Sequence, residues 1–123
     1  MSRLEIEYRP DESTATSVLH LRGQATYREA PELRRRLFEA VADRPQGRLV
    51  LELAEVEKMD TAAMAVLVEA LLATRLEALE LYFCTPSESV RKIFELAGLE
   101  DALARCYGCL DDALRDTLTP ASR

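Results

Sequence analysis

The pair Asp60-Thr61 is where residue types and position could support regulated chemistry. It lies between a strand-like run that ends near Val56 and a segment with helical periodicity over about 61–74, so we expect it at a helix entrance. The first N–H groups of a helix lack partners within it, and Asp60 is a suitable N-cap whose charge faces the positive end of the helix dipole. A phosphate on Thr61 would add up to about two negative charges beside Asp60. A partner fitted to the unmodified loop would then lose contact, so the pair could work as a switch.

The helix behind this pair has two apolar faces on a helical wheel. One face is typical of a core and consists of Met64, Leu67, Val68 and Leu71. The opposite face, flanked by Ala63 and Ala70, consists of Ala62, Val66, Glu69 and Ala73. Small apolar residues where a surface helix is normally charged indicate a docking face. Two simpler interpretations stay open: Thr61 is only a cap, or a closing helix covers this face.

Two other groups of residues carry reactive side chains. Cys106 and Cys109 form a CxxC between an expected strand and an expected helix, which would suit a thiol-redox protein; incidental cysteines are the simpler interpretation. His20 is the only histidine, which excludes a multi-histidine zinc site, and nothing in the spacing brings it to a cysteine. No Gly-rich phosphate loop follows a strand. We therefore predict no catalytic residue, no cofactor and no metal, and a protein that is not an enzyme.

Length and charge limit the other possibilities. The chain has 123 residues, which fits one domain over 1–123. Its net charge of −6, with Arg34-Arg35-Arg36 as the one basic cluster, argues against nucleic acid and anionic lipid as partners. We interpret that triplet as the solvated face of a helix. The longest apolar run is interrupted by Glu69, and the N-terminus lacks a signal-peptide pattern. We expect no membrane insertion and a cytoplasmic protein with reduced cysteines.

The periodicity predicts nine elements in the order β-β-α-β-α-β-α-β-α. Strands are expected at 4–8, 17–22, 48–56, 78–84 and, briefly, within 99–106. Helices are expected behind the capping box of Thr26 and Glu29, at 61–74, behind the capping box of Thr85 and Glu88 as far as Gly98, and at 110–118. The first two strands suit a hairpin, and the later alternation predicts parallel strands. The fold class is therefore α/β, with a mixed β-sheet and about four helices. Asp60 and Thr61 fall at the carboxyl end of a central strand, where open α/β sheets tend to bind ligands and partners.

Several motifs in this order resemble the STAS domain of bacterial anti-sigma factor antagonists, over about 4–118. The family's Gly-x-x-Asp step, with Ala and Leu behind it, is matched by 23–26 and then Ala30 and Leu33. Its hydrophobic-Asp-Ser-Ser-Gly-Leu motif is matched by 59–64, and its Leu-x-Gly-Leu and Glu-Glu-Ala-Leu steps by 96–99 and 111–114. The chain departs from the family at Thr26, where the Asp stands, at Ala63, where the Gly stands, and at Thr61, where Ser is commoner.

The resemblance implies a partner and a modification. Such antagonists bind an anti-sigma factor, commonly a serine/threonine kinase, and so free a sigma factor. The kinase phosphorylates the hydroxyl residue after the Asp, which matches Thr61, and a phosphatase resets the switch. The expected partner-binding residues are Met59, Asp60, Ala62, Ala63, Val66, Glu69 and Thr26. STAS domains also serve unphosphorylated as assembly subunits of lipid-transport ABC complexes and in stress-signalling scaffolds, and that alternative stays open, as does the oligomeric state.

Overall fold

The computed structural model describes residues 3–11, 15–43, 46–74, 78–84, 88–96 and 106–107. Within them the elements follow the order β-β-α-β-α-β-α-β. The strands are β1 (Leu4–Asp11), β2 (Thr16–Ala25), β3 (Gln46–Met59), β4 (Ala78–Cys84) and β5 (Cys106–Tyr107). The helices are α1 (Ala30–Asp43), α2 (Thr61–Thr74) and α3 (Glu88–Leu96). The α/β class is confirmed. The described residues contain three helices rather than about four, because the helix expected at 110–118 lies outside them.

The sheet is mixed, as predicted, and its five strands lie in the order β1-β2-β3-β4-β5. β1 and β2 form the expected antiparallel hairpin, and the remaining neighbours are parallel. β3 is therefore the central strand, and Asp60 follows its carboxyl end directly.

The strand limits in the first half were predicted too short. Pro10 and Asp11 were interpreted as a turn, but both belong to β1. β1 is at the edge of the sheet, where a proline costs no inter-strand hydrogen bond if its nitrogen faces outward. Gly23 was expected to end the second strand, but β2 continues to Ala25. Gly23 has a φ of +102°, and a Cβ there would collide with the Arg3 carbonyl oxygen, so glycine is required at this position.

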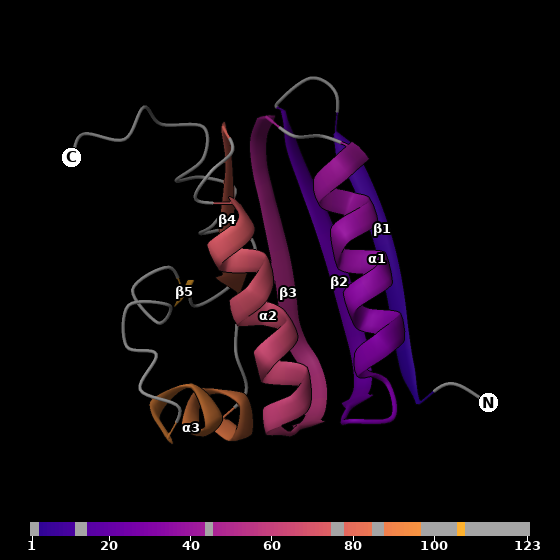
Figure 1. Ribbon diagram of the computed structural model, residues 1–123, viewed down its shortest axis with the longest axis vertical. Coiled ribbons are helices and arrows are strands. Elements are labelled where there is room, and N and C mark those ends of the chain that lie inside the picture. The colour runs from indigo at the N-terminus through magenta and orange to yellow at the C-terminus, as the bar shows by residue number, and fades with distance from the viewer. Residues whose placement is uncertain are drawn as a thin grey trace.

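The main core contains buried residues of the sheet and of all three helices. α1 and α2 lie over one face of the sheet, and α3 lies at the end of the sheet where β3 runs into α2 (Figure 1). Leu33 and Leu37 of α1, and Met64 and Leu67 of α2, are buried against this face. Phe94 of α3 meets the Phe83 ring edge to face, with centroids 5.4 Å apart. The core thus fixes the three helices relative to the carboxyl ends of the strands.

The arginine triplet of α1 is largely a solvated face, as the sequence predicted, because Arg34 and Arg35 are exposed and only Arg36 is partly buried. Successive helix residues point about 100° apart, so three adjacent side chains take three directions. Arg34 binds Glu69 of α2, Arg35 binds Glu39 of its own helix, and Arg36 donates to the Ile6 carbonyl oxygen of β1. Two of the three arginines therefore connect α1 to other elements.

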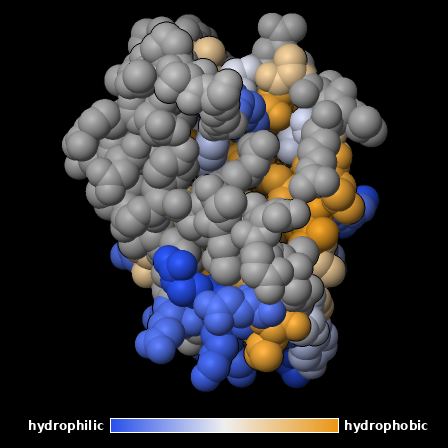
Figure 2. Space-filling view, turned by 90° about the vertical axis from the view of Figure 1, so that its left-hand side faces the viewer, coloured by the Kyte–Doolittle hydropathy of each residue, from blue (hydrophilic) through white to orange (hydrophobic). Residues whose placement is uncertain are grey.

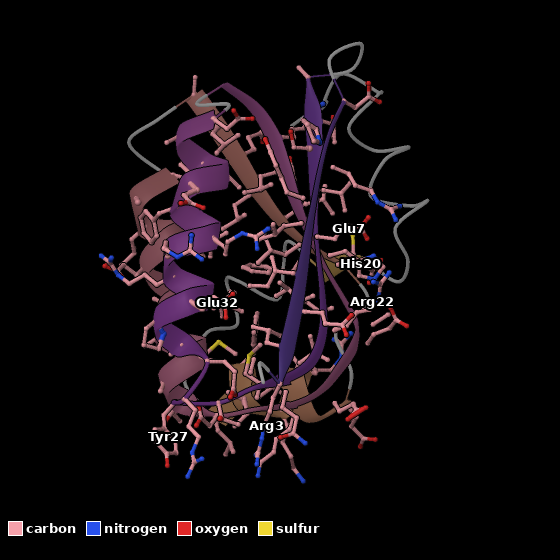
Figure 3. All side chains as sticks on the ribbon, turned by 90° about the vertical axis from the view of Figure 1, so that its right-hand side faces the viewer. Arg3, Glu7, His20, Arg22, Tyr27 and Glu32 are labelled. Atoms are coloured by element: carbon pink, nitrogen blue, oxygen red, sulfur yellow. The ribbon has the colours of Figure 1, made fainter. Side chains whose placement is uncertain are left out.

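Glu7, His20 and Arg22 project from the sheet face opposite α1 (Figure 3). Glu55 accepts from Arg22 at 2.7 Å, and its other close neighbour is the His20 Nε2 atom at 3.1 Å. The pKa of Glu55 is lowered, chiefly by the hydrogen bond from Arg22. Arg22 forms ion pairs with both Glu55 and Glu7 at this partly exposed surface.

Candidate functional site

Thr61 is the first residue of α2 and its side chain is exposed. The helix limits, Thr61–Thr74, agree with the periodicity. The backbone of Asp60 is held on both sides, because its N–H donates to the Ala25 carbonyl oxygen at 3.2 Å and its own carbonyl oxygen accepts from Met64 at 3.0 Å. The exposed hydroxyl therefore stands on a backbone fixed between β2 and α2.

The Asp60 carboxylate joins two segments of the chain. Its Oδ1 atom accepts from the Ala63 N–H at 3.1 Å, which is the predicted N-cap. Its Oδ2 atom accepts from the Tyr27 N–H at 2.8 Å, in the loop that leads into α1. Because each carboxylate oxygen has a backbone donor, Asp60 fixes the entrance of α2 against the loop before α1.

The start of α1 has its own carboxylate, Glu29, from the predicted capping box. Glu29 Oε1 accepts from the Thr26 N–H at 2.9 Å and from the Thr26 hydroxyl at 2.7 Å. Both residues are buried, with 7% of Glu29 and 8% of Thr26 exposed. These hydrogen bonds from Thr26 lower the pKa of Glu29. Where the family motif has an Asp, this chain places a Thr whose polar groups are satisfied by a carboxylate three residues later.

Tyr27 is the residue of this site that sequence reasoning missed. Its backbone binds Asp60, and 63% of the residue is exposed. The ring projects from the lower end of the molecule, and the guanidinium carbon of Arg28 lies 5.7 Å from its centroid (Figure 3). Its position directly after the capping residue Thr26 was visible in the sequence, but an exposed aromatic ring has no periodic signal.

The docking face predicted for α2 was wrong in part. Val66, assigned to that face, and its flanking residues Ala63 and Ala70 are buried. Val68, assigned to the core face, is only partly buried. The exposed positions of α2 are instead Thr61, Ala65, Glu69 and Leu72, with Ala62, Val68 and Ala73 partly exposed. The outer face formed by these exposed positions still carries a single charge, that of Glu69. The exposed positions of α3 are all charged except Leu96, and the lower end of the molecule, where α3 lies, is largely blue in Figure 2.

The expected partner-binding residues therefore divide into two groups. Met59, Thr26, Ala63 and Val66 are buried, so their side chains support the site from inside. Asp60 and Ala62 are partly exposed, and Glu69 is exposed. Arg34 of α1 already holds Glu69 through two hydrogen bonds of 2.8 and 2.9 Å. This hydrogen bonding lowers the pKa of Glu69. The exposed part of the site is Asp60, Thr61, Ala62, Tyr27 and the outer face of α2.

A family model for the STAS domain matches residues 6–113, most of the chain. The chain belongs to the STAS domain family. The STAS motif around 59–64 is thus the segment that forms the end of β3 and the exposed start of α2.

Solved STAS structures share this fold. The anti-sigma factor antagonist SpoIIAA in its unphosphorylated form is 15% identical, covers 96% of this chain and 100% of its own, and superposes with a TM-score of 0.77. An anti-sigma factor antagonist from Mycobacterium paratuberculosis is 23% identical, with coverage of 94% and 95% and a TM-score of 0.80. A murine anion transporter of the solute carrier 26 family is 11% identical and has a TM-score of 0.74 over 85% of this chain and 18% of its own. No curated protein matches by sequence.

The thiol alternative gains no geometric support. Cys84 is buried and forms no disulfide, and β3 lies between it and His20, because Glu52 is the register partner of both residues. Cys106 begins β5, and Cys109 lies outside the described residues. In the described part of the chain, no three His, Cys, Asp or Glu side chains gather as a metal site. No helix among the described residues is long and apolar enough to cross a membrane.

Proposed function

We propose that this STAS domain is a non-enzymatic protein-binding switch of the anti-sigma factor antagonist type, acting in the cytoplasm. The unmodified domain binds an anti-sigma factor that is a serine/threonine kinase, the kinase phosphorylates Thr61, and a phosphatase restores the binding form. One observation carries the proposal: Thr61 is exposed at a helix start whose neighbouring carboxylate, Asp60, is held by two backbone N–H groups.

A phosphate on Thr61 would act through its charge. Asp60 cannot turn away from a new charge without losing the Ala63 or the Tyr27 hydrogen bond. A phosphate on Thr61 would bring up to about two more negative charges to this surface. A partner that contacts the nearly uncharged outer face of α2 would then have to bury or avoid those charges, and burying an unpaired charge is strongly unfavourable.

The first experiment is affinity purification of the tagged domain from its native cells, with mass spectrometry of the co-purifying proteins and of the Thr61 peptide. A kinase-like ATPase together with phosphorylated Thr61 supports the switch. The co-purified kinase, produced on its own, is then titrated with the wild type and with Thr61→Ala, Thr61→Gln and Thr61→Glu. Thr61→Gln is the matched control, because it has nearly the size of Thr61→Glu without its charge.

We expect Thr61→Ala and Thr61→Gln to bind within a few-fold of the wild type, and Thr61→Glu to lose at least about tenfold in affinity, which corresponds to about 1.4 kcal/mol. Equal binding of all four proteins would show that charge at Thr61 does not control the interaction, and the switch would be abandoned.

A second candidate function is an unphosphorylated assembly subunit, as in a lipid-transport complex. Two transport proteins that share the fold support this second function: the murine anion transporter and a sulfate transporter family protein from Wolinella succinogenes. Under this function the purification yields transporter subunits and unmodified Thr61. Ala62→Arg, at a partly exposed position, should then abolish binding while the domain stays folded by circular dichroism.

A further inference from the structure

The loop before α1 is held against the start of α2. The Tyr27 N–H donates to the Asp60 carboxylate at 2.8 Å, and the Asp60 N–H donates to the Ala25 carbonyl oxygen at 3.2 Å. Arg28 follows Tyr27 directly in this loop, as Thr61 follows Asp60. These hydrogen bonds therefore bring the backbones of Arg28 and Thr61 close together, although the two residues lie far apart in the sequence.

The side chain of Arg28 is exposed, and its hydrogen bond and ring contact within the described residues are both with Tyr27. Its Nε atom donates to the Tyr27 hydroxyl at 3.2 Å, and its guanidinium carbon lies 5.7 Å from the ring centroid. Arg34 and Arg35 of α1, in contrast, both bind carboxylates. Among these arginines, Arg28 is thus the one whose charge rests against neutral groups.

Two other cations near this end of the molecule are placed differently. Arg3 also lies at the lower end in Figure 3, where it donates to the Gln24 side-chain oxygen at 3.3 Å. Lys58 precedes Met59 in β3, and successive side chains of a strand point to opposite faces. Because Met59 is buried in the main core with the helices, Lys58 points to the other face of the sheet. Arg28 therefore combines a place in the loop that Asp60 binds with a neutral partner that it can leave.

A phosphate on Thr61 changes which partner is best for Arg28. The phosphate brings three acceptor oxygens and up to about two negative charges beside Asp60. Both Asp60 oxygens accept from backbone N–H groups, so the carboxylate stays in place and repels the phosphate. Arginine binds phosphate through two parallel N–H···O bonds, and each such bond is roughly twice as strong as a neutral one, like that to the Tyr27 hydroxyl. Moving the flexible Arg28 side chain to the phosphate therefore offsets the repulsion from Asp60.

We infer that Arg28 binds the phosphate of phosphorylated Thr61 within the same chain and gives up its contacts with Tyr27. The inference rests on the proposed function, because it requires a phosphate on Thr61. It adds a second change to the switch: charge appears at the start of α2, and the exposed Tyr27 ring loses its guanidinium. A partner that contacts both segments then meets an altered surface at each of them.

The test uses the full chain with phosphothreonine inserted at position 61 during synthesis, so that no kinase is needed. The second ionisation of the phosphate is titrated by phosphorus NMR at low salt, with and without Arg28→Gln. A nearby cation favours the doubly charged phosphate, so it lowers the midpoint of this ionisation. We expect the midpoint to lie at least about 0.5 pH unit lower with Arg28 than with Arg28→Gln. The Arg28 Nε–H resonance should shift along the same titration curve.

Arg35→Gln is the matched control, because Arg35 is exposed on α1 and binds Glu39. Arg3→Gln tests the other arginine at the lower end. Both should move the midpoint much less than Arg28→Gln, and folding of each variant is checked by circular dichroism. Equal midpoints with Arg28 and with Arg28→Gln overturn the inference, as does a larger change for Arg3→Gln. If Arg28→Gln does not fold, an Arg28 Nε–H resonance that ignores the titration overturns it instead.

This result is separate from the test of the proposed function. An unchanged midpoint removes the Arg28–phosphate pair and leaves the switch at Thr61 standing, since binding of Thr61→Glu to the kinase tests that switch. Equal binding of the Thr61 variants to the kinase removes the switch, whichever midpoint is measured.

Discussion

The starts of α1 and α2 each have a carboxylate that satisfies backbone N–H groups, but they differ in what else the carboxylate holds. At α1, Glu29 is buried and accepts two hydrogen bonds from Thr26, three residues earlier, so this arrangement lies within one turn of the chain. At α2, Asp60 is partly exposed and binds both its own helix and the loop before α1. The residue after Asp60, Thr61, is exposed.

This difference separates a structural helix start from one that can carry a signal. A buried, closed capping arrangement can only be kept or broken, so Glu29 is suited to holding the loop in place. The start of α2 is accessible and rigid at once, because Asp60 restrains two segments while leaving the neighbouring hydroxyl in solvent. Removing each polar group in turn should therefore have very different effects on stability, in the order Asp60, Glu29, Thr61.

The largest effect is expected for Asp60→Ala, which removes the acceptor of both the Ala63 and the Tyr27 N–H groups. Loss of a cap and of a second hydrogen bond to a charged group should lower the free energy of unfolding by about 2 kcal/mol, measured by urea denaturation. Asp60→Asn keeps one carbonyl oxygen and should lose about half of that. If Asp60→Ala lies within about 0.5 kcal/mol of the wild type, Asp60 does not fix the two segments.

The sequence predicted the local parts of this comparison. Both caps follow from spacings of three residues, and the limits of α2 follow from its periodicity. The bond between Asp60 and Tyr27 joins residues 33 positions apart. It depends on how far β3 extends beside β2, including the register shifts between them, and no local pattern encodes that.

The orientation of α2 was harder to predict for a related reason. Only Glu69 is charged in this helix, so the apolar residues form no single stripe and a helical wheel gives no reliable direction. The burial of Val66 and Ala63 results from packing between α1, the sheet and α2, which is a tertiary effect. The partners of the α1 arginines could not be predicted for the same reason, because Arg34 binds Glu69 and Arg36 binds the Ile6 carbonyl oxygen, both far away in sequence.

A smaller effect, and one that depends on pH, is expected for Glu29→Gln. The amide keeps an acceptor oxygen for Thr26 but loses its charge, so we expect a loss of about 1 kcal/mol at pH 7. Since folding lowers the pKa of Glu29, its ionised form stabilises the protein above the unfolded-state pKa, and this contribution disappears as pH falls through the folded-state pKa. The difference from the wild type should therefore shrink on acidification.

Urea denaturation between pH 7 and pH 3 measures this difference. Glu39→Gln is the matched control, because Glu39 is exposed on the same helix and binds Arg35. It should change stability by less than about 0.5 kcal/mol. A Glu29→Gln loss that stays constant with pH would mean that the charge of Glu29 is not what the Thr26 groups bind.

The smallest effect is expected for Thr61. Its side chain is exposed and the cap of α2 is Asp60, so Thr61→Ala should stay within about 0.5 kcal/mol of the wild type in the same denaturation experiment. Thr61→Glu should also fold, because a carboxylate in the first helical turn interacts favourably with the helix dipole, by about 0.3–1 kcal/mol, and this offsets repulsion from Asp60. A loss above about 1 kcal/mol for Thr61→Ala would make the hydroxyl a structural group, like the Thr26 hydroxyl at α1. If both variants instead keep wild-type stability, a loss of partner binding by Thr61→Glu alone must come from the charge at the exposed surface and not from unfolding of α2.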